Sequence, residues 1–172
     1  MRDIKEFQIL DINAVNKGHN IFDLMVNAGK QLAKHIIVNF PESKLFLFVC
    51  GKGNNAGDGY IAASILHKDG FNVKVMKIGG ELKPIPADAL KLYQGEIVES
   101  SFFDDVSKES TLLVDCLLGS GIRGEPHESF VKAISKINNF PSILSVDVPS
   151  GFLKKTSVKP TETITFHDSK KG

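Results

Sequence analysis

Four short apolar stretches of the chain have the pattern of buried strands. Each is rich in β-branched or aromatic residues and is bounded by turn residues. None alternates cleanly between polar and apolar positions, which is typical of strands covered on both faces, as in a parallel sheet. We predict strands over residues 44–50, 72–78, 111–117 and 142–148, with two weaker candidates at 96–98 and 162–166.

Amphipathic helical patterns separate the predicted strands. Residues 21–39 carry an apolar stripe at a spacing of four positions, formed by Leu24, Ala28, Leu32 and Ile36. Shorter helices are predicted over 58–68 and 127–137. Strands that alternate with helices at these lengths favour βαβ units. The sequence therefore predicts an α/β fold, a three-layer Rossmann-like domain with a mostly parallel sheet, helices on both faces and an extra helix before the first strand.

Composition narrows the class of protein. The chain has 172 residues, of which 42% are hydrophobic and 24% charged, with a formal net charge of +1. This length suits a single domain over residues 1–172, and the charge disfavours nucleic-acid binding because no basic field surrounds the domain. No apolar run approaches the roughly 20 residues that cross a bilayer, and residues 1–6 lack the pattern of a secretory signal. We expect a cytoplasmic protein without a membrane segment, with buried thiols at Cys50 and Cys116.

A glycine-rich segment follows the first predicted strand. Residues 51–59 read Gly-Lys-Gly-Asn-Asn-Ala-Gly-Asp-Gly, and glycines there let the backbone approach a ligand at the start of a helix. Gly51, Gly53 and Ala56 match the spacing of a dinucleotide-binding turn, but the acidic residue expected about 20 positions later is missing. The segment also lacks the Lys-Ser or Lys-Thr of a phosphate-binding P-loop. A dehydrogenase or a phosphotransferase is therefore disfavoured.

Three polar residues of this segment are candidates for ligand contacts. Asn54 and Asn55 can donate and accept hydrogen bonds or coordinate a cation, and Asp58 supplies a carboxylate. Each also has a purely structural interpretation. Asp58 would cap the helix predicted from that position, and the two asparagines would serve the geometry of a turn. Both interpretations stay open on the sequence alone.

Acidic residues interrupt the third and fourth apolar stretches. Asp115 and Asp147 lie inside strand-like runs, where a carboxylate is costly unless it is paired, hydrogen-bonded or bound to a metal. A Gly-Ser-Gly loop at 119–121 and Arg123 follow Asp115. The guanidinium suits phosphate, and it equally suits a solvated surface. Asp147 precedes a Pro-Ser-Gly turn at 149–151.

The carboxyl ends of parallel strands meet at one edge of a sheet, so we predict that these loops share a site. Asn55, Asp115 and Ser150 would supply oxygen ligands, which suit a hard cation better than zinc. The five histidines are scattered, and no Gly-x-Ser-x-Gly elbow indicates a hydrolase triad. The chemistry that remains is acid–base catalysis by Asp147 or Asp115 near a bound nucleotide.

Taken together, these motifs resemble the YjeF N-terminal domain family. The resemblance covers nearly the whole chain, with the motifs in the family's order: 24–29 (Leu-Met-Val-Asn-Ala-Gly), 53–59, Asp115 with 119–121, 147–151, and 163–166 with Lys171-Gly172. It implies a Rossmann-like fold, a homodimer and one bound potassium ion (K+) per subunit.

The resemblance also implies an activity. Members of the family are NAD(P)H-hydrate epimerases, isomerases that interconvert the R and S forms of hydrated NADH and NADPH (NAD(P)HX) at C6 of the nicotinamide ring. This metabolite-repair step feeds an S-specific, ATP- or ADP-dependent dehydratase, which we expect to be a separate protein. Carried over by position, potassium would bind Asn55, Asp115 and Ser150. Asp147 would be the principal acid–base residue, and Asp115 would orient water or the ion.

The same resemblance implies which residues bind the hydrated dinucleotide. They form two segments, one at each of two strand ends, together with one acid at a third. The residues are Asn54, Asn55, Ala56, Gly57, Asp58, Gly119, Ser120, Gly121, Ile122, Arg123, Gly124, Glu125 and Asp147.

Several positions depart from the family pattern. Ala56 stands where glycine is usual, Ser120 where threonine is common and Val26 where an acid is common. The connection 152–162 is shorter than usual, and the chain is expected to be C-terminally short relative to the family, which affects the far edge of the sheet and dimerisation. The alternative to an epimerase is a non-catalytic nucleotide- or RNA-binding dimerisation module of the same fold. The retained loop acids favour the enzyme.

Overall fold

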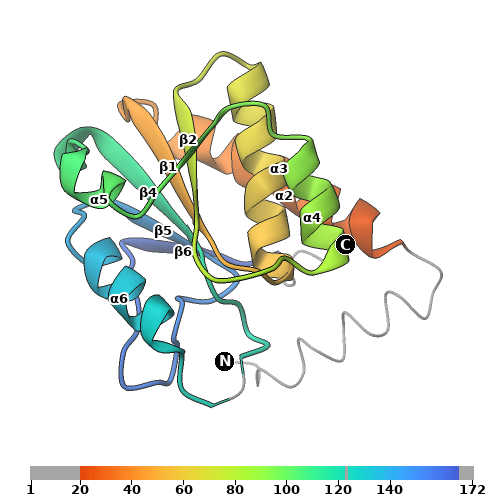
Figure 1. Ribbon diagram of the computed structural model, residues 1–172. Helices are drawn as coiled ribbons and strands as arrows, with labels where there is room; N and C mark the ends of the chain where they lie inside the picture. The colour runs from red at the N-terminus through yellow and green to blue at the C-terminus, as the bar shows by residue number, and fades with distance from the viewer. Residues whose placement is uncertain (1–19, 123, 167–172) are drawn as a thin grey trace.

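A six-stranded parallel sheet forms the centre of the protein. The computed structural model describes residues 20–122 and 124–166, and the strands follow the order β3-β2-β1-β4-β5-β6 (Figure 1). They are β1 (Leu45–Cys50), β2 (Val73–Lys77), β3 (Glu96–Val98), β4 (Thr111–Cys116), β5 (Ile143–Val146) and β6 (Glu162–Ile164). Each lies within a predicted strand, so the predicted parallel sheet is confirmed.

Helices cover both faces of this sheet (Figure 1). Three of them pack together on one face: α2 (Ile21–Asn39), α3 (Asn54–Lys68) and α4 (Pro84–Lys91). The other face carries α5 (Phe102–Asp105) and α6 (Glu128–Ile137). The predicted three-layer α/β class and the helix before the first strand are confirmed.

Alternate residues of β1 belong to two separate hydrophobic cores. Phe46 and Phe48 pack beneath the layer of α2 and α3, whereas Leu47 and Val49 pack in the core that contains α6. All residues of this strand are buried. This explains the unbroken apolar run in the sequence, because a strand between two helical layers has no solvent-facing side.

Helix α3 approaches the sheet closely at Gly59. A Cβ at this position would lie 2.7 Å from Cys116 Sγ and 3.2 Å from Cys50 Sγ, so a larger residue would push the helix away. Both thiols are buried, as predicted, and neither forms a disulfide. The close approach positions the first turn of α3 next to the carboxyl ends of β1 and β4.

The start of α3 differs from the prediction. The helix begins at Asn54 rather than at residue 58, and its N-cap is Gly53 in an extended conformation. Asp58 is therefore not the cap, and Asn54 and Asn55 lie in the first helical turn rather than in a loop turn. Packing of the buried Gly57 against Met25 of α2 keeps this segment helical in spite of its low helix propensity.

Two short helices and one strand end were also missed. No element was predicted where helix α4 forms. The helix begins with Pro84 and contains Pro86, and proline in a first turn lacks only an N–H group that has no helical partner. Helix α5 spans a single turn. The strand predicted over 142–148 stops at Val146, because Asp147 has a left-handed φ of 68°.

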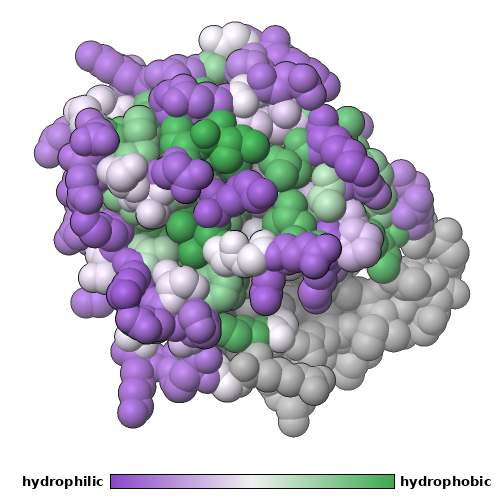
Figure 2. Space-filling model, viewed as in Figure 1, coloured by the Kyte–Doolittle hydropathy of each residue, from purple (hydrophilic) through white to green (hydrophobic). Residues whose placement is uncertain are grey.

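The surface of the molecule is of mixed polarity. Hydrophilic residues cover most of the face seen in Figure 2, and hydrophobic residues show between them. Over residues 20–122 and 124–166, no helix has both the length and the apolar character needed to cross a membrane.

Candidate active site

Three loops follow the carboxyl ends of the adjacent strands β1, β4 and β5. The chain runs from β1 to β2 on one side and from β4 to β5 on the other, so the direction of the strand order reverses between β1 and β4. Doubly wound sheets bind ligands at such a reversal. A Cβ at Gly119 would lie 3.1 Å from Asp147 Oδ2 and 3.2 Å from Asn55 Cβ, so the three loops meet at one place.

A fully buried carboxylate, that of Asp115, ties two of these strand ends together. Its Oδ2 accepts hydrogen bonds from Ser145 Oγ at 2.8 Å and from the Ser150 backbone N–H at 2.9 Å. Its Oδ1 accepts from Ser150 Oγ at 2.5 Å and from the Leu117 N–H at 3.2 Å. With four donors, both oxygens have their full complement of hydrogen bonds.

Burial and hydrogen bonding act on Asp115 in opposite directions. Burial disfavours the charged form and raises the pKa of the Asp115 carboxyl above its ordinary value, which is the larger effect. The hydrogen bonds from Ser150, Ser145 and Leu117 stabilise the charge and lower this pKa. A cation nearby would act in the same direction as these hydrogen bonds.

Asp147 is a half-buried carboxylate at the end of β5. Its backbone holds the left-handed φ of 68°, and its N–H donates to the Ile164 carbonyl of β6 at 2.9 Å. Its Oδ2 accepts the Ser120 N–H at 2.9 Å, while Oδ1 has no hydrogen bond from any described residue. A left-handed conformation is unusual for a residue other than glycine, and it points this side chain toward the loop that follows β4.

Asn55 has a buried side-chain amide with no hydrogen-bond partner. The residue is 9% exposed, and neither Oδ1 nor Nδ2 is paired with any part of the chain that the structure describes. Buried amides are nearly always hydrogen-bonded, so an unpartnered one indicates a bound water, ion or ligand. Since Asn55 lies next to Gly119, the amide without hydrogen-bond partners lies at the junction of the three loops.

The motifs and this geometry agree with a known family. The model for the family described as YjeF-related protein N-terminus matches residues 22–172. The chain belongs to this family. The predicted resemblance is thereby confirmed.

Curated relatives from the YjeF N-terminal family match nearly the whole chain. The bifunctional NAD(P)H-hydrate repair enzyme Nnr of Pyrobaculum aerophilum is 35% identical, over 97% of this chain and 37% of the relative. The enzyme of the same name from Escherichia coli K12 is 34% identical, over 90% of this chain and 32% of the relative. The chain thus spans about a third of the length of these relatives.

A solved structure supports the fold. The crystal structure of yeast ynu0 superposes with a TM-score of 0.83 at 22% identity, over 94% of this chain and 77% of the yeast chain. At this identity the likeness establishes the Rossmann-like fold alone.

The other candidate residues of this YjeF-family chain lie in different environments. Ala56 and Gly57 are buried beneath α2, so they offer backbone atoms rather than side chains to a ligand. Half-buried positions are Asp58, Ser120 and Ile122, and exposed ones are Asn54, Gly121, Gly124 and Glu125. Arg123 lies outside the described residues.

Ser145 was missed by the sequence analysis. It lies in β5 directly opposite Asp115 in the parallel register, and it is fully buried. Its hydroxyl donates to the Asp115 carboxylate. The sequence offers one indication of this role, a serine in an otherwise apolar strand. That serine can be recognised as a partner of Asp115 only when the strand register is known.

Proposed function

We propose that this protein is an NAD(P)H-hydrate epimerase, which interconverts the R and S forms of hydrated NADH and NADPH. The relatives are named bifunctional NAD(P)H-hydrate repair enzymes, and the chain matches about a third of their length. The observation that carries the proposal is the setting of Asp147. This carboxylate is held by a left-handed backbone and the Ser120 N–H, beside the unpartnered amide of Asn55.

The reaction needs one group that gives and takes a proton. In the hydrate, C6 carries a hydroxyl beside the ring nitrogen, so loss of water leaves an iminium-like cation, and water returning to the other face gives the other epimer. Opening of the C6–N bond is a second route. Asp147 protonates the departing oxygen and then deprotonates the incoming water, and its negative charge stabilises the cation in between.

Asp115 acts as a positioning residue in this proposal. It is fully buried and its oxygens are occupied by Ser145, Ser150 and Leu117, so it does not touch the substrate. Through Ser150 it holds the β5 loop that begins with Asp147. It also contributes a buried negative charge beneath the developing cation.

A potassium ion fits the oxygen set at this place. The described residues hold no group of three His, Cys, Asp or Glu suited to a metal, so a cation here would bind mostly neutral oxygens. Asn55 offers an unpartnered Oδ1, Ser150 a hydroxyl oxygen and Asp115 the compensating charge. When bound, such an ion supplies a fixed positive charge that favours ionised Asp115 and orders the three loops.

The proposed activity implies further partners. The substrates are hydrated NADH and NADPH, and an S-specific dehydratase would consume the S form. A homodimer and a cytoplasmic location belong to the same proposal.

The decisive experiment is epimer interconversion. One resolved epimer of hydrated NADH is mixed with the protein in potassium or sodium salt, and the epimer ratio is followed by chromatography. We expect approach to equilibrium faster than in the protein-free control, and faster with potassium. Asp147→Asn should lower the rate at least ~100-fold, since general acid–base catalysis contributes about that much. Asparagine tolerates the left-handed backbone, so the fold should persist.

Asp105→Asn is the matched control, because it makes the same chemical change at an exposed position on α5. It should leave the rate unchanged. If the folded wild-type protein binds dinucleotide without accelerating epimerisation, the non-catalytic binding module replaces the epimerase as the explanation.

A further inference from the structure

A cavity of about 120 Å³ lies beside the Asp147 loop. Part of its lining belongs to the loop after β4, which the sequence analysis singled out. The rest comes from the loop after β5, of which only Asp147 and Ser150 were expected to contact ligands. The lining residues are Gly119, Ser120, Ile122, Val148, Phe152, Leu153 and Lys154.

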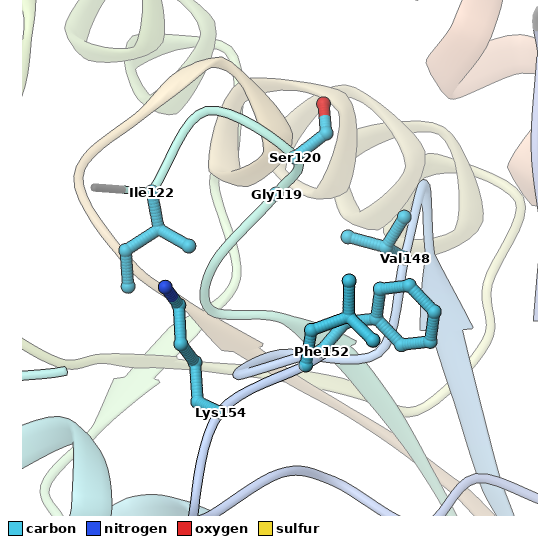
Figure 3. A pocket seen from close by; sticks show the side chains of 7 residues that line it. Gly119, Ser120, Ile122, Val148, Phe152 and Lys154 are labelled. Carbon is cyan, nitrogen blue, oxygen red and sulfur yellow. The ribbon is translucent and has the colours of Figure 1, made fainter. Parts of the chain in front are cut away.

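The described residues that line the cavity form apolar walls and include one cation, the Lys154 ammonium group. Ile122 and Lys154 lie on one side of it, and Val148 and Phe152 on the other (Figure 3). The Lys154 amino group extends toward Ile122, at the opposite side from the Phe152 ring (Figure 3). This pairing suits a ligand with a flat, weakly polar ring at one end and an anionic group at the other.

The loop that carries these residues is held by its own hydrogen bonds. The Phe152 N–H donates to the Pro149 carbonyl, and the Lys154 N–H to the Gly151 carbonyl, both at 2.9 Å. Gly151 has a φ of 78° and packs against the backbone of Thr156, so no other residue fits there. The cavity wall is thereby fixed to the same turn whose Ser150 binds Asp115.

Two large apolar side chains at the cavity are turned toward solvent. Leu153 is 78% exposed and Phe152 is 37% exposed. Leu153 also holds a left-handed φ of 60°, a strained conformation for leucine that is typical of ligand-contacting segments. The apolar contacts that these side chains lack in the free protein are available to a bound ring.

Lys154 has no acidic partner among the residues that the structure describes. The ion pairs found there involve other lysines and one histidine. Unlike the adjacent Lys155, which is exposed, Lys154 is half-buried at the cavity. An unpaired ammonium beside an apolar wall attracts a phosphate more strongly than one in open solvent.

We propose that this cavity is a second substrate-binding region of the epimerase proposed above, on which the inference rests, and that Lys154 binds a phosphate of the dinucleotide. Phe152 and Val148, on the opposite side of the cavity, hold the adjoining ring. The region extends the site from the β4 loop to residues 148–154, and it makes Lys154 a determinant of substrate affinity.

Binding of NAD+ and NADP+, measured by calorimetry, tests this without requiring turnover. Lys154→Ala should weaken binding roughly 10-fold, the effect of one charge-assisted hydrogen bond. Lys155→Ala removes the same charge from the neighbouring exposed position and should leave affinity unchanged. Lys154→Arg should retain most of the affinity, because it keeps the cation.

The two ligands identify which phosphate Lys154 contacts. Loss of affinity for NADP+ alone assigns the 2′-phosphate, and equal loss for both ligands assigns the diphosphate. Nicotinamide mononucleotide and ADP, tested in the same way on Phe152→Ala, identify which ring the cavity holds. Equal affinities of the Lys154→Ala and Lys155→Ala proteins for both dinucleotides would overturn the proposal, as would failure of the folded wild-type protein to bind either.

The epimerisation assay separates this proposal from the function on which it rests. A wild-type protein that binds dinucleotide through Lys154 but does not interconvert epimers would sink the proposed activity and leave the binding region intact. If the wild-type protein interconverts epimers and Lys154→Ala changes neither the rate nor the KM, the proposed activity stands and the proposed binding region is overturned.

Discussion

The Ser150 hydroxyl donates a 2.5 Å hydrogen bond to the Asp115 carboxylate, joining two positions that lie 35 residues apart in the chain. The same hydroxyl accepts the Leu118 N–H at 2.8 Å. One small side chain thus connects the end of β4, the loop after it and the turn after β5. The arrangement around Asp147 depends on this connection.

Removing that hydroxyl should destabilise the protein. Ser150→Ala removes the shortest of the four hydrogen bonds to the buried Asp115 carboxylate and takes away the Ser150 hydroxyl that accepts the Leu118 N–H, which we expect to lower the free energy of unfolding by about 2 kcal/mol. Urea unfolding followed by circular dichroism measures the change. Ser135→Ala, at an exposed position of α6, should change it by less than about 0.5 kcal/mol. A similar effect for both variants would mean that the Asp115 network contributes no stability.

A methyl group at Gly119 should impair activity more than stability. The Cβ of Gly119→Ala would lie 3.1 Å from Asp147 Oδ2 and 3.2 Å from Asn55 Cβ, so both groups must shift by a few tenths of an ångström. We expect epimerisation to slow roughly 10-fold, because small displacements of a catalytic group are costly. The control is Gly80→Ala in the loop after β2, an exposed position outside the predicted substrate-binding residues, where a Cβ meets nothing within 4 Å. Equal rates for the two variants would place the reacting carboxylate elsewhere.

Potassium should stabilise the protein through Asn55. Compared with equal sodium, we expect potassium to raise the melting temperature by roughly 2–4 °C, the shift given by about 1 kcal/mol of binding energy. Asn55→Ala should abolish the difference, because it removes the unpartnered buried amide. Asn54→Ala, in the same helical turn but exposed, should retain it. A potassium effect that survives in Asn55→Ala would assign the ion to other ligands.

The raised pKa values of the two tyrosines predict that the protein loses stability at alkaline pH. Burial, reinforced by Glu96, raises the pKa of Tyr93 from 10.0 to about 12, and burial also raises the pKa of Tyr60. The folded state therefore keeps the Tyr93 proton longer than the unfolded chain does. The resulting stability is fully present below pH 10 and is lost as pH rises through about 12.

Phenolate absorbance measures the ionisation of the tyrosines in the folded protein, and the signal is simple because the chain contains two tyrosines and no tryptophan. The native protein should show little phenolate at pH 10, where the protein unfolded in urea is half ionised. In Tyr93→Phe, the loss of stability between pH 10 and about 12 should be smaller than in the wild-type protein, because Tyr93 no longer contributes to it. Half-ionisation of the native protein at pH 10 would show that neither phenol is protected.

Much of the fold was predictable because strands buried on both faces leave a plain signal. The apolar runs at 44–50 and 111–117 became β1 and β4. The start of α3 was not predictable, because Gly57 and its neighbours are held helical by contact with Met25, a residue more than 30 positions away. Local composition there favours a loop, and only tertiary packing decides otherwise.

Of the residues of the candidate site, too, some were predictable from local sequence and others depend on tertiary structure. Asp115 and Asp147 were identifiable because a carboxylate within a buried run must have a reason to be there. Ser145 and Lys154 were not, since a serine in a strand and a lysine in a loop are unremarkable on their own. Their places depend on strand register and on the left-handed turns at Gly151 and Leu153.

The close packing of α3 on the sheet at Gly59 buries two thiols whose reactivity can report the motion of this helix. Cys50 and Cys116, the only cysteines of the chain, are fully buried beneath this glycine. A thiol reagent can reach them only when the helix lifts from the strands, so the labelling rate measures how often that layer opens. Because Asn55 lies in the first turn of the same helix, a ligand bound there should slow the labelling. Occupancy of the site can thus be followed without substrate and without an engineered probe.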